Sequence, residues 1–428
     1  MRMQAKRMQQ ATSTREAMHS SRGGRIASLL LALAACAGGA QAQSLDLRGY
    51  ADFRLAAPAS EEDWSDGGLG KTRFGGDGGA AFSGGAALAA SFQLTPELLA
   101  SAELQYLPEA RHPLDVLEAW VRYRPVSTTP WRWSAKLGAF FPPVSLENDS
   151  IGWTSRWTLT PSAINSWVGE ELRTVGAELR VEHRGDAGTL TAQAALFGHN
   201  DPAGELLAAR GWGMGDLTSG LGAELREPDV YAPVAYAPVP MLYRPFIEID
   251  DRIGWYAGVE WDSPAHGRLA LLRYDNRADP AAEVGYAGRE LYAWHTRFWS
   301  LGARARSGDI VFIAQLMDGS TAFEPVPGLL LDTRFHAGYL LAGWERGDWQ
   351  PALRVDVFGL RQLPDTLDAP LDEHGNAVTF ALNWRPRDNL RVVGEILRLD
   401  STRDQRRLAG LAPRQLDIQV QLGVRVLF

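Results

Sequence analysis

The sequence contains a single cysteine and no long hydrophobic run, and both absences narrow the possibilities. Because Cys36 lies within the first 42 residues, the rest of the chain can form neither structural disulfides nor a thiol active site. No run of about 18 or more apolar residues occurs, which argues against a protein built from membrane-spanning helices. Any membrane segment must therefore be encoded by alternation rather than by continuous hydrophobicity.

Residues 1–42 have the composition of a signal peptide. Arg22 and Arg25 precede an apolar run from residue 26 to 37, and the small-residue site Ala40-Gln41-Ala42 follows. We therefore expect export, with residues 43–428 forming a single domain.

Two details of this segment stay open. The stretch before Met18 is long for a signal peptide, so Met18 is our expected translation start. Leu33-Ala34-Ala35-Cys36 also resembles a lipobox, which would make Cys36 a lipidated N-terminus, but the Ala-x-Ala site just after it favours ordinary cleavage.

Basic residues are scarce after the signal peptide. Residues 43–428 carry 37 Lys and Arg against 50 Asp and Glu, because the first 42 residues hold six basic residues and one acidic one. This balance argues against nucleic acid as a partner. The eight histidines form no His-x-x-x-His pair, so we expect no metal site and no cofactor. Residues 68–72 resemble the end of a phosphate-binding loop, but Ser65 replaces its first Gly, and we expect an exposed loop.

What the chain does contain is alternation of apolar and polar residues. In the last segment Leu416, Ile418 and Val420 alternate with Asp417 and Gln419, and the pattern continues to the C-terminal residue. Similar segments recur along the whole chain. In a bilayer only a closed barrel satisfies the backbone of such strands, so the pattern predicts an all-β, transmembrane antiparallel β-barrel.

The spacing of these segments predicts about 16 strands, an even number that places both termini at one end. We expect short turns at that end and long loops at the other, and strict alternation of the two along the chain. Several Trp residues near strand ends suit the aromatic belts at the membrane interfaces. The predicted strands are residues 45–56, 80–92, 98–107, 115–124, 131–140, 173–184, 188–198, 250–262, 267–275, 291–306, 309–318, 333–346, 349–361, 377–386, 390–399 and 415–428.

The segment Lys136-Leu-Gly-Ala-Phe-Phe-Pro-Pro-Val-Ser-Leu-Glu-Asn148 resembles the strand-to-loop segment of phosphate-selective porins of the O/P type, and Phe428 matches the porin sorting signal. The resemblance implies a diffusion channel, often trimeric, in the outer membrane of a Gram-negative bacterium. It also implies contact with lipid, lipopolysaccharide and the barrel assembly machinery.

The same family implies that the third external loop folds inward and narrows the lumen. Residues 141–172 are the candidate, because this long segment contains Asp149, Arg156 and Glu170. The alternative is a loop that packs on the rim of the barrel.

Charged residues at inward positions would set selectivity. Arg122, Arg124, Arg132 and Lys136 could form a basic wall, with Glu118 close by. Glu103, Glu178 and Glu182 could neutralise that wall, so anion preference is only weakly predicted. We find no dense ladder of Lys and Arg of the kind that a phosphate channel would need.

The sequence therefore predicts a porin for passive diffusion of small hydrophilic solutes, monomeric or trimeric, with no catalysis. A barrel lipase or protease is the main alternative, but no Ser-containing motif accompanies His183, His199, His295 or His336. Tyr231, Tyr236 and Tyr243 in the loop 199–249 leave open a binding surface. A TonB-dependent receptor would need about 22 strands and a plug domain, for which the chain lacks room.

Overall fold

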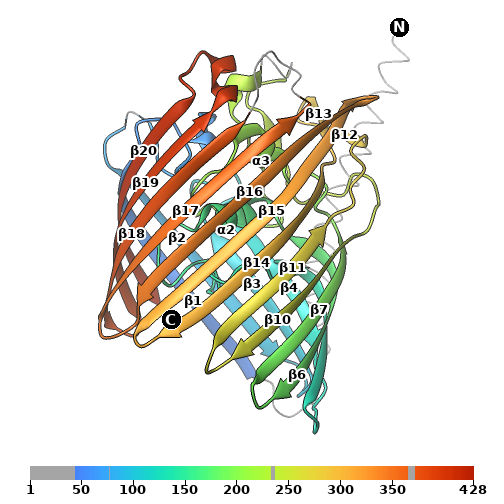
Figure 1. The fold of residues 1–428 in the computed structure, drawn as a ribbon, viewed down its shortest axis with the longest axis vertical. Helices are drawn as coiled ribbons and strands as arrows, with labels where there is room; N and C mark the ends of the chain where they lie inside the picture. Colours follow the sequence, from blue (N-terminus) through green and yellow to red (C-terminus); the bar gives the residue numbers. More distant parts are fainter. Residues whose placement is uncertain (1–43, 77, 233–236, 365–371) are drawn as a thin grey trace, which may run out of the picture.

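A computed structural model describes residues 44–76, 78–232, 237–364 and 372–428. The predicted signal peptide, Met18, Cys36 and Tyr236 lie outside the described residues. The described chain forms one closed antiparallel barrel in which each strand pairs with the next and β20 pairs with β1 (Figure 1).

The barrel has 16 strands, which confirms the predicted fold class. They are β1 (Ser44–Ala57), β2 (Ala81–Gln93), β3 (Leu98–Tyr106), β4 (Leu114–Tyr123), β5 (Trp131–Phe140), β6 (Thr174–Gly185), β7 (Gly188–Gly198), β10 (Gly254–Ser263), β11 (Gly267–Asp275), β14 (His295–Ser307), β15 (Ile310–Val326), β16 (Leu329–Trp344), β17 (Trp349–Leu363), β18 (Glu373–Arg387), β19 (Leu390–Arg403) and β20 (Arg414–Leu427).

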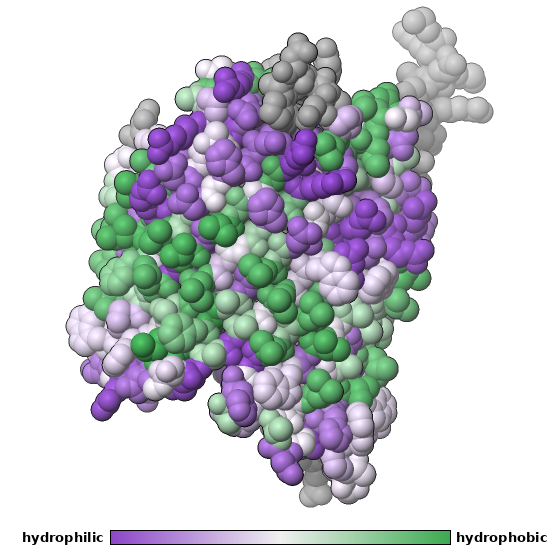
Figure 2. Space-filling view, viewed as in Figure 1, coloured by the Kyte–Doolittle hydropathy of each residue, from purple (hydrophilic) through white to green (hydrophobic). Residues whose placement is uncertain are grey.

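Alternation within each strand separates an apolar outer face from a polar inner one. On β20, Ile418 is 52% exposed and points outward, whereas the neighbouring Asp417 and Gln419 are each 1% exposed and point inward. On the face seen in Figure 2, hydrophobic residues form a band across the middle of the barrel, with more hydrophilic zones above and below it. Exposed Trp side chains accompany the belt, including the stacked pair Trp349 and Trp384, whose ring centroids lie 5.6 Å apart.

Connections differ in length at the two ends of the barrel. Turns such as 308–309 and 388–389 are short, and both termini of the barrel lie at that end, as predicted. At the opposite end, four connections matter for the interior: loop 1 (residues 58–80), loop 2 (107–113), loop 3 (141–173) and loop 4 (199–253).

One connection at the long-loop end contradicts strict alternation. β15 and β16 extend beyond the predicted strands 309–318 and 333–346, and only Pro327 and Gly328 join them. The tight turn is possible because Gly328 adopts φ +85°, which a residue without a Cβ reaches without strain.

The remaining elements belong to the connections at the long-loop end. Within the described residues, no helix is both long and apolar enough to cross a membrane. These elements are η1 (Trp64–Asp66), α2 (Ala163–Glu171), α3 (Glu205–Arg210), β8 (Leu225–Arg226), η2 (Asp229–Tyr231), β9 (Leu242–Tyr243), β12 (Glu283–Tyr286), β13 (Arg289–Tyr292) and η3 (Asp404–Ala409).

Candidate functional site: the barrel lumen

Loop 3 leaves β5, enters the barrel and reaches the opposite wall. It carries α2, whose N-terminus is capped by the Ser162 side chain accepting a hydrogen bond from the backbone N–H of Asn165. The backbone N–H of Ala163 donates to Asp356 Oδ1 of β17 at 3.2 Å. Since β17 lies eight places from β5 in the sixteen-strand order, the loop spans the lumen.

Arg354 of β17 is the central anchor of loop 3. Its guanidinium is fully buried and donates to Glu147 Oε1 at 2.6 Å, to the carbonyl oxygens of Thr160 and Pro161 at 2.8 and 2.9 Å, and to Asp356 Oδ2 at 2.8 Å. A buried charge is tolerated only when it is paired and hydrogen-bonded in this way. The loop therefore holds a fixed position against this wall.

Neighbouring strands add further anchors along the same segment of loop 3. Arg391 of β19 donates to the carbonyl oxygen of Ser155 at 2.9 Å, and Arg425 of β20 donates to Thr154 Oγ1 at 3.1 Å. Glu395 of β19 accepts from the backbone N–H of Thr160 at 3.0 Å. Charged groups of β17 and β19 thus bind the loop backbone directly, and Arg425 of β20 binds a loop side chain.

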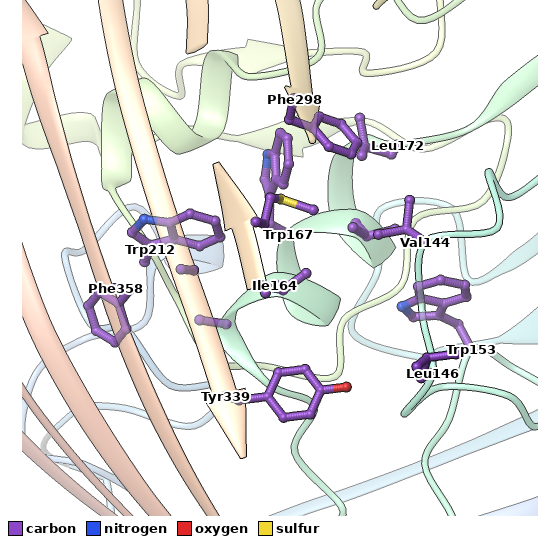
Figure 3. Packing of buried hydrophobic residues seen from close by; sticks show 14 of the residues in the cluster. Val144, Leu146, Trp153, Ile164, Trp167, Leu172, Trp212, Phe298, Tyr339 and Phe358 are labelled. Atoms are coloured by element: carbon purple, nitrogen blue, oxygen red, sulfur yellow. The ribbon is translucent and has the colours of Figure 1, made fainter. Parts of the chain in front are cut away.

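The interior half of loop 3 is packed by aromatic and aliphatic side chains. Trp167 of α2 is fully buried, and its ring lies 5.1 Å from Phe335, 5.7 Å from Phe298 and 6.0 Å from Trp212 between centroids (Figure 3). Such edge-to-face aromatic packing is the chemistry of a protein core. This part of the barrel interior is therefore filled with side chains.

Loop 4 packs against α2 in the same part of the barrel interior. Arg210 and Glu170, both 1% exposed, form a two-pronged ion pair with N–O distances of 3.1 and 2.8 Å. Glu171 accepts from the backbone N–H groups of Leu206 and Leu207, at 3.0 and 3.1 Å. Burial raises the pKa of Glu171 to about 7, although the hydrogen bond from Leu206 opposes the shift.

Loop 1 also enters the barrel at Lys71. Its ammonium donates to Glu373 Oε1 at 2.6 Å and to the carbonyl oxygen of Trp212 at 2.7 Å. Burial lowers the pKa of Lys71 to about 8. The expectation of an exposed loop at residues 68–72 is therefore wrong, because the lysine is drawn to a buried carboxylate.

The predicted lining residues on β4 and β5 occupy a different wall. Lys136 pairs with Glu178 at 3.1 Å, and Glu118 accepts from the backbone N–H of Phe141 at 2.6 Å. Arg122 and Arg132 are half-buried, and Arg124 is exposed just beyond β4. The four basic residues share one region near the short-turn end.

Loop 3 carries the other predicted residues. Asp149 lies 3.6 Å from Arg304, and Arg156 lies 2.6 Å from Glu345, both partners being near the short-turn end. Glu170 is enclosed by the packing described above. Tyr231 and Tyr243, considered for a binding surface, are 6% and 0% exposed and cannot present one.

Sequence reasoning missed the role of a row of inward arginines on β17, β19, β20 and β1, which bind the loops. They are Arg354, Arg391, Arg403, Arg425 and Arg54. Alternation did place Arg54, Arg354 and Arg425 on the inner face, but it could not show that loops would bind these side chains. The expectation that the chain has no dense Lys and Arg ladder, of the kind that a phosphate channel would need, stays a prediction, because these arginines are buried and bound to loops.

Comparisons with known proteins agree with this fold. No protein-family model matches the chain, and no curated protein matches its sequence. The outer membrane channel DcaP of Acinetobacter baumannii is similar in structure, with a TM-score of 0.53 and 10% identity over 91% of this chain and 99% of that one. The loop L8 deletion mutant of OmpT, an outer membrane protein of Vibrio cholerae, gives 0.51 and 8% over 91% and 100%. The barrel therefore has the fold of outer-membrane porins, as predicted.

Proposed function

We propose that the protein is a porin of the outer membrane, through which small hydrophilic solutes diffuse passively. The observation that carries this is a closed barrel of 16 strands with an apolar belt outside and charged side chains inside. A belt of this kind suits contact with lipid and lipopolysaccharide. Enclosed charged groups would act on passing solutes.

Loop 3 would narrow the lumen, since it crosses from β5 to β17 and is fixed at both walls. Glu118, Arg122, Arg124, Arg132 and Lys136 are proposed to line the space that remains, with Asp149 and Arg156 at its periplasmic side. We propose that Glu170 holds the loops together instead, because its carboxylate is buried against Arg210. A weak preference for anions follows from the basic side chains of β4 and β5. The resemblance of residues 136–148 to phosphate-selective porins supports no particular solute.

Phe428 is proposed as the sorting signal for the barrel assembly machinery. Its backbone pairs with Gly49 through two hydrogen bonds of 2.9 and 3.0 Å, while its side chain is 67% exposed beside β1. A terminal aromatic at the closing seam is accessible to an assembly factor. We also propose a homotrimer, as one structural neighbour, the in-vitro folded OmpT of Vibrio cholerae, is described in a trimer form.

Single-channel recording in a planar lipid bilayer tests the proposal. The refolded protein should produce discrete ion-conducting steps, and complete absence of steps over a wide range of protein and voltage would overturn the channel function. A hydrolase alternative is tested with lipase and protease substrates in detergent. Among the described residues, Ser263 Oγ and His266 Nδ1 form a hydrogen bond of 3.2 Å, at a short turn far from the loops.

A further inference from the structure

The inner face of the barrel is not filled evenly. On β2 to β6, most side chains that point into the lumen remain partly accessible. On β14 to β20 and on β1, most lumen-facing side chains are buried. Partly accessible examples are Ala89, Ser91, Ser101, Glu103, Trp120, Arg122, Lys136 and Arg180, and buried examples are Ser300, Gln315, Phe335, Arg354, Thr379, Glu395 and Gln421.

Side-chain size is one cause of this difference. The lumen-facing positions of β2 are occupied mainly by Ser83, Gly85, Ala87, Ala89 and Ser91, which project little into the interior. Loop 3 is bound to β17 and β19 by Arg354, Arg391 and Glu395, and it meets β3 where the backbone N–H of Gly152 donates to Glu103. The small side chains of β2 leave space along this side of the barrel.

Two adjoining cavities occupy this side at the external end. The outer one has a volume of about 280 Å³ and lies among loops 1, 2 and 4, with Trp64, Arg111 and Glu224 in its lining. The inner one lies against β1 to β3 and has a volume of only about 30 Å³, which is room for about one or two waters. Gln105 and Leu107 line both cavities, so the two cavities adjoin.

A cluster of ion pairs lines the inner cavity. Asp216 of loop 4 binds Arg54 of β1 at 2.6 Å and Arg73 of loop 1 at 2.8 Å. Arg73 also donates to Ser83 Oγ of β2 at 3.0 Å, and Asp52 binds Arg54 at 2.9 Å. We call Asp216, Arg54 and Arg73 the latch, because one carboxylate joins two loops and the barrel wall.

We propose that solutes cross this barrel off its axis, along the wall formed by β2 to β6, and that the latch is the narrowest point and main selectivity element of the route. The inference rests on the proposed porin function. In this proposal, the side chains on the wall from β14 to β20 hold the loops in place. A charged solute entering from outside would meet both signs of charge at the latch, so small ions and polar solutes would pass more readily than bulky ones.

Cysteine substitution separates the two walls, because the chain has no cysteine after Cys36. Ser101→Cys and Ser300→Cys make the same chemical change at lumen-facing positions of β3 and β14, and Ser300 is only 3% exposed. A water-soluble, cationic methanethiolsulfonate reagent should lower the single-channel conductance of Ser101→Cys and leave that of Ser300→Cys unchanged. Mass measurement should show the adduct only on Ser101→Cys.

The outcomes distinguish a failure of the porin function from a failure of the off-axis route. If the unmodified protein gives no conducting steps, the porin function fails. If it conducts, but Ser300→Cys is modified as readily as Ser101→Cys or only Ser300→Cys is blocked, the off-axis route is wrong. A folded, conducting Ser101→Cys that resists modification would also overturn the route.

The latch has its own test. Asp216→Asn keeps the shape of the side chain but removes the charge that joins Arg54 and Arg73, so conductance should rise about twofold as the loops separate. Asp388→Asn, which makes the same change in an exposed short turn, should conduct like the unaltered protein. Equal conductance of Asp216→Asn and the unaltered protein would remove the latch from the narrowest point.

Discussion

A single buried arginine shows how the interior is held together. Arg354 satisfies Glu147, Asp356 and two carbonyl groups of loop 3, so its loss leaves two buried carboxylates without their main counter-charge. Breaking such a pair costs about 3–5 kcal/mol. Because loop 3 does not pair with the barrel strands, losing Arg354 should destabilise the attachment of the loop rather than the barrel itself.

We therefore expect Arg354→Met to loosen loop 3 while the barrel still forms. Open-channel current noise should increase, and limited proteolysis should cleave within residues 141–173. Arg361→Met, on the same strand but exposed, is the control and should behave like the unaltered protein. The double variant Arg354→Met with Glu147→Gln should regain part of the lost attachment, since it removes one of the unpaired charges. If the Arg354→Met channel shows no increase in open-channel current noise and resists proteolysis, Arg354 does not anchor loop 3.

At the scale of single elements, the β15–β16 hairpin depends on one glycine. Gly328 has φ +85°, and a Cβ there would meet no other atom within 4 Å, so any cost of substitution comes from the backbone alone. Gly328→Ala should destabilise the folded barrel by about 1 kcal/mol, since an L-residue disfavours this conformation by about 1–2 kcal/mol. Gly394→Ala on β19, which also has open space around its Cβ position, serves as the control. Urea unfolding in lipid vesicles should separate the two variants, and equal midpoints would argue against turn strain.

The same hairpin shows how far the sequence could predict the elements. Alternation located all 16 strands because side chains in a barrel wall must satisfy lipid on one face and the interior on the other. It underestimated β15 and β16 because Gly319, Ser320 and Thr321 interrupt the apolar series while their backbone continues to pair with β16. The position of loop 3 came only from a resemblance. Its partners, such as Arg354, lie more than a hundred residues away, and no local pattern encodes such contacts.

For the whole molecule, the distribution of charge between the two walls decides which side chains affect ion selectivity. Lys136 lies on the partly accessible wall, 3.1 Å from Glu178, whereas Arg156 sits on loop 3 beside Glu345 at 2.6 Å. Since a charge acts most strongly on ions that pass close to it, the two residues should differ in effect if the route is off-axis.

Replacing Lys136 with Glu should move the reversal potential in a salt gradient toward cation preference, because the introduced carboxylate would lie beside Glu178 and no cation would offset either charge. Arg156→Glu should shift the potential in the same direction but less, as Arg156 belongs to the loop that is bound to the far wall. Arg346→Glu, in an exposed short turn, makes the same reversal of charge away from the lumen and should cause little change. If Lys136→Glu leaves the potential unaltered while Arg156→Glu shifts it, ions must pass on the loop 3 side, and β4 and β5 do not line the channel.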